Sequence, residues 1–166
     1  MGRLYTSGVG LSMGEPGEFP RLVPPEAHEL AAARRLAAAT TSPVGVRPAL
    51  ATTIGVVATD VALTKAQRAK VSGIAHDGMA RGIRPVHTMF DGDTVFTMAT
   101  GARQTADPLA FHQLLDAAGD CFTRAVGQAM LASESVETPA GRWRCYRDPF
   151  PSAFRAAYTE SYQTHG

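Results

Sequence analysis

The feature that most constrains the fold is a short apolar segment of β-type sequence inside a chain that otherwise favours helices. Residues 51–60 read Ala-Thr-Thr-Ile-Gly-Val-Val-Ala-Thr-Asp, and their branched side chains suit a strand. The apolar character of residues 52–59 is nearly continuous, with a glycine inside. That pattern is typical of a strand covered on both faces or approached closely by another backbone. The segment is therefore predicted to be a core strand.

A helix is expected before this strand in the sequence and another after it. One runs from Pro25 to about Thr40, and another follows Thr64, which is a suitable N-cap. The second helix contains Gly73, Gly78 and Gly82. Each of these costs about 1 kcal/mol relative to alanine, so we expect the three glycines to permit close packing against a sheet.

A second strand is predicted at residues 94–99, after a turn at residues 90–92. Asp107 and Pro108 then provide an N-cap and a first-turn proline for a long helix. One apolar stripe of this helix is predicted to face the core; it consists of Leu114, Leu115, Ala118, Phe122, Ala125 and Ala129. The residues after 133 are expected to form a loop.

Composition limits the classes of function. The 166 residues are 45% apolar and 19% charged, as in a soluble globular protein with a sizeable core. The net charge is +1 without a basic cluster, so no nucleic-acid partner is expected. No apolar stretch reaches the ~18 residues that a membrane helix needs, so no membrane partner is expected either. Cys121 and Cys145 show no spacing typical of metal ligands and are interpreted as free thiols. A cytoplasmic protein without cofactor or metal is therefore expected.

Two threonines directly before the apolar run could carry chemistry. If the peptide bond before Thr52 breaks, its hydroxyl becomes a nucleophile and its free α-amine a base within one residue. An α-amine has a pKa of roughly 7.7–8.0, so part of it is neutral near physiological pH. The hydroxyl of Thr53 would point to the opposite face of the strand. An ordinary core strand explains the same residues and is the more frequent use of such a run.

Four sequence blocks resemble the L-aminopeptidase/D-esterase family, which includes the β-peptidyl aminopeptidases, and they keep the order and spacing of that family. They are Thr-Thr-Ile-Gly-Val-Val-Ala-Thr-Asp at residues 52–60, Ala-Leu-Thr-Lys-Ala-Gln at 62–67, His-Asp-Gly-Met-Ala-Arg at 76–81 and Arg-Pro-Val-His-Thr-Met-Phe-Asp-Gly-Asp-Thr-Val-Phe at 84–96. The resemblance implies an α+β fold, an αββα sandwich of the N-terminal-nucleophile type that is incomplete at its N-terminus. It also implies that residues 1–51 belong to a large-subunit-like segment and a linker, and residues 52–166 to the small catalytic subunit.

By the same resemblance, Thr52 is the expected nucleophile and Thr53 its competitor. Asp91 and Asp93 stand where a Ser-Gly-Glu type motif positions the nucleophile's amine in the family. An Asp-Gly turn without a catalytic role is the alternative interpretation of these residues. His87, in an extended approach to that turn, is interpreted as a hydrogen-bonded structural histidine.

Two departures from the family pattern qualify the prediction. Ala51 precedes the nucleophile where the family usually has Asn or Gly, so self-cleavage is expected to be slow or absent. Most of the family's larger subunit has no counterpart here, so an unpaired sheet edge and an apolar face should be exposed. A missing large-subunit segment or a homo-oligomer is expected to cover them.

The predicted function is a self-processing aminopeptidase, amidase or esterase acting on small peptides or on amino acid amides and esters. One alternative is a catalytically inactive fragment or interaction domain of the same fold. Acyl transfer of the ornithine acetyltransferase type is a further alternative, because it uses the same threonine logic.

Overall fold

The computed structural model describes residues 23–39, 52–104, 107–139 and 141–154. Ala51 and the linker expected before it lie outside the described residues. The chain divides into two compact units, one formed by Arg47–Val126 and the other by Met1–Val46 with Gly127–Gly166. None of the described helices combines the length and apolar character that crossing a bilayer requires.

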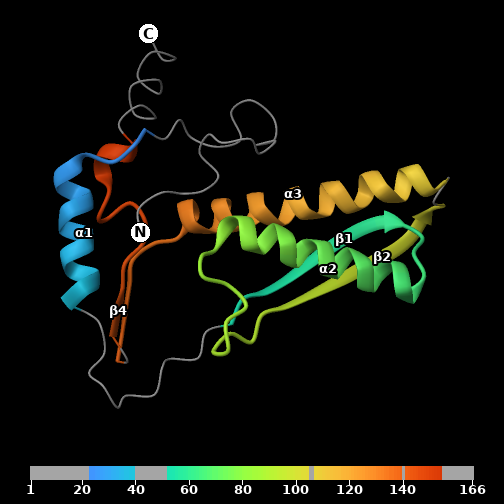
Figure 1. Cartoon of the computed structure of the whole chain (residues 1–166), viewed down its shortest axis with the longest axis horizontal. Helices are drawn as coiled ribbons and strands as arrows, with labels where there is room; N and C mark the ends of the chain where they lie inside the picture. Colours follow the sequence, from blue (N-terminus) through green and yellow to red (C-terminus); the bar gives the residue numbers. More distant parts are fainter. Residues whose placement is uncertain (1–22, 40–51, 105–106, 140, 155–166) are drawn as a thin grey trace, which may run out of the picture. The chain divides into compact units, whose positions relative to one another are not determined.

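The unit Arg47–Val126 is built on two parallel strands and two helices (Figure 1). Strand β1 (Ile54–Val61) is followed by helix α2 (Lys65–Gly82), strand β2 (Thr94–Arg103) and helix α3 (Pro108–Ala132), which ends beyond this unit. The register pairs Ile54 with Thr94 and continues to Thr59 with Ala99. Because the strands are parallel, their N-terminal ends meet at the same edge of the sheet. Strand β1 begins two residues later than predicted and β2 extends further than predicted.

Both helices pack on one face of this sheet. One core cluster joins Val95 of β2 to Met79 of α2 and Phe122 of α3. Its neighbour joins Val71 of α2 to Ala118 of α3 and the buried Leu63. Val57 of β1 packs against both clusters, so the inward-facing side chains of the strands hold the helices in place.

The other face of the sheet is apolar and exposed. Exposure alternates along β1, and the outward side chains of Ile54, Val56, Phe96 and Met98 are 70%, 53%, 55% and 61% exposed. Of the two interpretations of this strand, coverage on both faces is wrong for the part of the chain that the structure describes, because both helices lie on the same side. The predicted exposure of an apolar face is confirmed.

Helix α2 begins as predicted. Thr64 Oγ1 accepts a hydrogen bond from the Gln67 amide at 3.2 Å, and Gln67 Oε1 accepts one from the Thr64 amide at 2.9 Å. This reciprocal pair is a capping box, which satisfies two backbone donors that the first turn of a helix otherwise leaves free.

The glycines of α2 serve the contact with α3 rather than one with the sheet. A Cβ placed on Gly78 would lie 2.2 Å from the carbonyl oxygen of Gly119, and one on Gly82 would lie 3.0 Å from Val126. The Thr123 hydroxyl of α3 donates to the Gly78 oxygen at 2.8 Å. Gly73 has no atom within 4 Å of such a Cβ. The packing prediction therefore had the wrong partner for Gly78 and Gly82, and was wrong altogether for Gly73.

Helix α3 begins at Pro108 as predicted. The Asp107 carboxylate accepts the Ala110 amide at 2.8 Å. Ala118 and Phe122 of the predicted stripe are buried. Ala125 and Ala129 are exposed, and Val126 packs against the core in their place. The buried positions are thus spaced by four residues, which keeps them on one face of a helix.

In the other unit, helix α1 (Ala27–Ala39) is accompanied by the antiparallel strands β3 (Val136–Thr138) and β4 (Gly141–Trp143) and by the short 3-10 helix η1 (Pro151–Phe154). The expectation of a loop after residue 133 missed this hairpin. Phe150, Ala153 and Phe154 form the small core here.

The buried Glu29 carboxylate accepts hydrogen bonds from the start of α1 and from η1. It accepts the Ser152 amide at 3.0 Å, the Glu26 amide at 3.2 Å and the Ser152 hydroxyl. Burial would raise the pKa of Glu29, but these donors outweigh burial and lower it. The carboxylate is thus held ionised by groups of both segments.

Candidate active site

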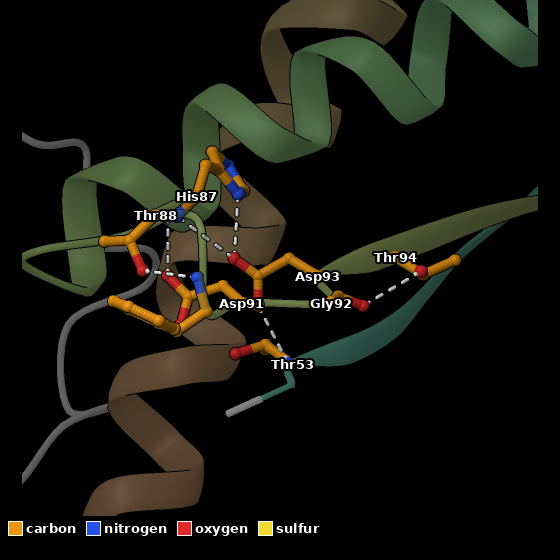
Figure 2. A network of polar contacts seen from close by, with 8 residues as sticks. Thr53, His87, Thr88, Asp91, Gly92, Asp93 and Thr94 are labelled. Carbon is orange, nitrogen blue, oxygen red and sulfur yellow. Dashed lines mark hydrogen bonds and ion pairs between the residues drawn. The ribbon is translucent and has the colours of Figure 1, made fainter. Parts of the chain in front are cut away.

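The residues proposed for chemistry lie together at the N-terminal edge of the parallel sheet. Thr52 and Thr53 lead into β1, and residues 91–93 lead into β2. The Thr94 amide donates to the Thr53 carbonyl oxygen at 2.9 Å, which fastens the two approaches to each other. Figure 2 shows the Asp-Gly-Asp turn beside Thr53 and below His87.

Asp93 is the centre of this network. Its Oδ1 accepts the Thr53 backbone amide at 2.9 Å. Its Oδ2 accepts the His87 backbone amide at 3.3 Å and lies 2.8 Å from His87 Nδ1. Only 5% of the Asp93 side chain is exposed, so each carboxylate oxygen has a protein partner in place of bulk water.

The electrostatics favour an ionised Asp93. Burial would raise its pKa, because a carboxylate loses hydration in the interior. The amides of Thr53 and His87 and the His87 ring act in the opposite direction, and together they lower the pKa of Asp93 below its ordinary value. Asp93 is therefore a fixed negative acceptor at the start of β1.

Thr52 lies against the middle residue of the turn. Its Oγ1 is 3.0 Å from the position that a Cβ on Gly92 would take, and its side chain is exposed. Gly92 does not have a positive φ, so space for the threonine hydroxyl explains glycine here better than backbone conformation does. Thr52 is thus an exposed threonine beside the turn that carries the buried Asp93 carboxylate.

Asp91 has a local role in the described structure. Its Oδ2 accepts the Thr88 amide at 2.7 Å, and its own amide donates to the Thr88 oxygen at 3.2 Å. The Thr94 hydroxyl closes the far side of the turn by donating to the Gly92 oxygen at 3.2 Å. These contacts are those of a turn, and Asp93 makes the contact with the start of β1. A role of Asp91 in positioning the nucleophile's amine stays a prediction.

The loop between α2 and β2 places His87 over Asp93. It contains a cis peptide bond between Arg84 and Pro85, and His87 has a φ of 54°. The His87 ring packs edge-on against the ring of His76 from α2, with centroids 4.8 Å apart. The predicted hydrogen bond of His87 is confirmed, but the predicted extended backbone is wrong, since this residue lies in the left-handed region.

Sequence reasoning missed two parts of this site. It assigned no partner to His87 and took Gly92 only as a turn residue. The proline-containing segment before the turn signals a bent approach, but nothing in the order of residues indicates which carboxylate the imidazole meets. Within the part of the chain that the structure describes, no three His, Cys, Asp or Glu side chains converge as metal ligands would.

Comparisons with known proteins identify relatives of this chain. The model of peptidase family S58 matches residues 21–144. A protein named uncharacterized aminopeptidase from Mycobacterium tuberculosis (strain ATCC 25618 / H37Rv) is 41% identical over 146 residues, which cover 83% of this chain and 41% of that protein. One of the same description from Mycobacterium leprae (strain TN) is 50% identical over 117 residues, covering 64% of this chain and 31% of its own length. The chain thus spans about two fifths or less of the length of these relatives.

Proposed function

Because this chain belongs to peptidase family S58, the L-aminopeptidase/D-esterase family, we propose that it is the nucleophile-bearing part of a self-processing aminopeptidase. Its substrates in this proposal are small peptides and amino acid amides or esters, which it opens at their amino end. The relatives' description as aminopeptidases supports this class of reaction.

The observation that carries the proposal is the contact between Thr52 and the Asp-Gly-Asp turn. Thr52 is exposed, and its Oγ1 lies 3.0 Å from the position that a Cβ on Gly92 would take. Next to it, Asp93 holds the amide of Thr53 at 2.9 Å, which fixes the backbone on the C-terminal side of Thr52. An accessible hydroxyl on a fixed backbone is what a nucleophile requires.

In the proposed self-cleavage, Thr52 Oγ1 attacks the carbonyl carbon of residue 51. The new C–O bond forms, the C–N bond to Thr52 breaks, and the hydroxyl proton passes to the departing nitrogen. Water then hydrolyses the ester and leaves Thr52 with a free α-amine. In turnover this amine accepts the hydroxyl proton while Thr52 Oγ1 attacks the substrate carbonyl carbon. The substrate C–N or C–O bond breaks, and the proton passes to the leaving amine or alcohol. Water then hydrolyses the acyl ester and restores the Thr52 hydroxyl.

Thr53 is the second candidate for the nucleophile, and one contact favours it. Cleavage before Thr53 would convert the amide that Asp93 holds into an ammonium group, which would pair with the buried carboxylate. Against it, both the amide and the carbonyl of Thr53 are engaged at the start of the sheet, whereas Thr52 precedes the ladder. We therefore propose Thr52.

Intact-mass spectrometry of the full chain tests the choice. Cleavage before Thr52 yields a C-terminal fragment that is heavier by one threonine residue than cleavage before Thr53. Thr52→Ala should abolish both cleavage and hydrolysis of aminoacyl p-nitroanilides, while Thr52→Ser should retain cleavage and Thr53→Ala should still be cut before residue 52. Cleavage that persists in Thr52→Ala would exclude this residue as the nucleophile.

The exposed apolar face of the sheet supports a proposal about partners. Four large side chains there are more than half exposed, and the relatives contain sequence beyond the matched part. We propose that a large-subunit segment covers this face in the assembled enzyme and completes the αββα sandwich. A second copy of the chain is the alternative occupant.

The same face also favours the second candidate function, a catalytically inactive interaction domain. A single uncleaved mass and no turnover, in a chain that unfolds cooperatively and binds the large-subunit segment, would support that function. Turnover that appears only when the segment is added would support the aminopeptidase.

A further inference from the structure

We propose that His87 is a positioning residue, which orients the Asp93 carboxylate so that Asp93 holds the backbone at the start of β1. Its effect on cleavage rests on the proposed function, whereas its effect on the backbone does not. The contact pattern, the backbone of His87 and the packing of its ring support the inference.

The two oxygens of Asp93 contact different residues. Oδ1 accepts a hydrogen bond from the Thr53 amide. Oδ2 accepts one from the His87 backbone amide at 3.3 Å and lies 2.8 Å from the His87 ring nitrogen Nδ1. A carboxylate is planar, so fixing one oxygen through two donors also fixes the direction of the other. His87 thereby determines where Oδ1 stands relative to Thr53.

The backbone of His87 is consistent with a retained side-chain function. With φ at 54°, the residue lies in a region that glycine adopts freely and that Asn, Asp and His adopt more often than other side chains. Such a conformation persists where the surroundings enforce it. Here it turns the amide and the ring of one residue toward the same oxygen.

The ring itself is restrained on its other side. His76 of α2 packs edge-on against it at a centroid distance of 4.8 Å and an interplanar angle of 63°. His87 is 37% exposed and Asp93 only 5%, so the imidazole covers the carboxylate while remaining partly in contact with solvent. Through Nδ1 the ring bonds Asp93 at 2.8 Å, and this contact with the carboxylate is the basis of the orienting role.

The contact with Asp93 can affect Thr52 through the peptide unit that joins Thr52 to Thr53. The Thr53 nitrogen is bonded to the carbonyl carbon of Thr52, so holding this amide restrains the peptide plane and the Cα of Thr52. Loss of the imidazole should let the Asp93 carboxylate rotate, weaken its bond to Thr53 and allow Thr52 to drift from its place over Gly92. Misplacement of a reacting group by about 1 Å costs on the order of a hundredfold in rate.

Two variants of similar size separate this role from others. In His87→Asn the amide nitrogen can take the place of Nδ1 and donate to Asp93, whereas His87→Asp presents only acceptors to a carboxylate. Both residues tolerate the left-handed backbone. We expect cleavage within about threefold of the wild-type rate in His87→Asn and about tenfold to a hundredfold slower in His87→Asp.

A second readout does not depend on turnover. In the full-length Thr52→Ala chain, which should stay uncleaved, NMR hydrogen exchange reports the Thr53 amide directly. Protection should be retained in His87→Asn and fall by about tenfold or more in His87→Asp. His87→Gly serves as a variant that relieves the backbone and should therefore fold. It should lose protection too, because the ring is gone, whereas a merely structural role predicts an unchanged Thr53 amide.

The outcomes separate the two proposals. Equal loss of Thr53 protection in His87→Asn and His87→Asp, or retained protection in His87→Asp and His87→Gly, would overturn the positioning role. If the wild-type chain shows neither cleavage nor turnover, even with the large-subunit segment added, the proposed function fails, and the exchange comparison still decides the role of His87.

Discussion

At the scale of single residues, the candidate site combines a glycine beside the Thr52 hydroxyl with a carboxylate whose pKa is lowered. Gly92 has no side chain to contact the Thr52 hydroxyl, and Asp93 is surrounded by donors. Both features can be tested by replacements that differ from the natural residue in one group of atoms.

Gly92→Ala should slow self-cleavage by displacing the Thr52 hydroxyl. The added methyl group would lie 3.0 Å from Thr52 Oγ1, closer than carbon and oxygen normally approach, so the threonine must move. We expect a reduction on the order of tenfold to a hundredfold, followed by intact mass over time. The unfolding midpoint should remain close to that of the wild type, because the backbone of Gly92 suits alanine. Cleavage at the wild-type rate would show that Thr52 does not need this position.

Asp93 should stabilise the fold in a pH-dependent way. Its pKa is lowered in the folded chain from an ordinary value of 3.8, so the folded state binds its proton less readily than the unfolded state. The stabilisation is complete above that ordinary value and is lost as the pH falls through the lowered folded pKa.

Denaturant unfolding of wild type and Asp93→Asn across a range of about pH 7 to pH 2 measures this dependence. The difference in unfolding free energy should be largest near neutral pH and shrink in acid. Asp116→Asn, a change of the same kind in α3, provides a comparison. A difference that stays constant with pH would contradict an ionised Asp93 as the stabilising form.

At the scale of elements, the contact between α2 and α3 depends on the absence of side chains at its closest point. Gly78 lies against the backbone of Gly119, and Thr123 bonds the oxygens of both residues. The two helices can therefore approach each other more closely than larger residues would permit.

Gly78→Ala should destabilise the unit Arg47–Val126 despite the better helix propensity of alanine. Its Cβ would lie 2.2 Å from the Gly119 oxygen, a backbone atom that cannot rotate away. Overpacking of this kind typically costs about 1–3 kcal/mol. Gly73→Ala is the matched control in the same helix, with no atom within 4 Å, and should be stabilising by about 1 kcal/mol. Chemical denaturation of the three proteins measures both effects, and equal stability of the two variants would contradict the close approach.

At the scale of the whole molecule, the sheet of the unit Arg47–Val126 has one covered and one exposed face. Adjacent valines of β1 point to opposite faces, which offers a direct comparison. Val56 is 53% exposed, whereas Val57 packs against both core clusters.

The same substitution should affect stability at one of these positions and self-association at the other. Val57→Thr buries a hydroxyl without a partner and should cost about 1–3 kcal/mol of unfolding free energy. Val56→Thr should change stability by less than about 0.5 kcal/mol, yet reduce self-association of the isolated chain. Denaturation and sedimentation velocity measure the two quantities. Self-association unaffected by Val56→Thr would indicate that the exposed face is not the surface involved.

Much of the fold followed from local sequence. The capping residue Thr64, the Asp107-Pro108 helix start and the two strands were predictable, because caps, prolines and branched side chains act on their immediate neighbours. Family membership followed from ordered blocks of residues around the same strands. Which glycines pack, and against what, was not predictable, since the close partner Gly119 lies in another helix.

The proximity of Thr52 to the Asp91–Asp93 turn was expected only through the family resemblance. The sequence by itself determined that two threonines precede the first strand and that an Asp-Gly-Asp turn precedes the second. Strand propensity and turn formation depend on neighbouring residues, so both features can be recognised locally. Only the tertiary structure decided that Asp93 reaches the Thr53 amide, that His87 contacts the other oxygen of Asp93 and that both helices cover the same face of the sheet. The physical reason is that these contacts join residues far apart in the chain, whose distances are set by the parallel pairing of β1 and β2 and by both helices packing on the same face.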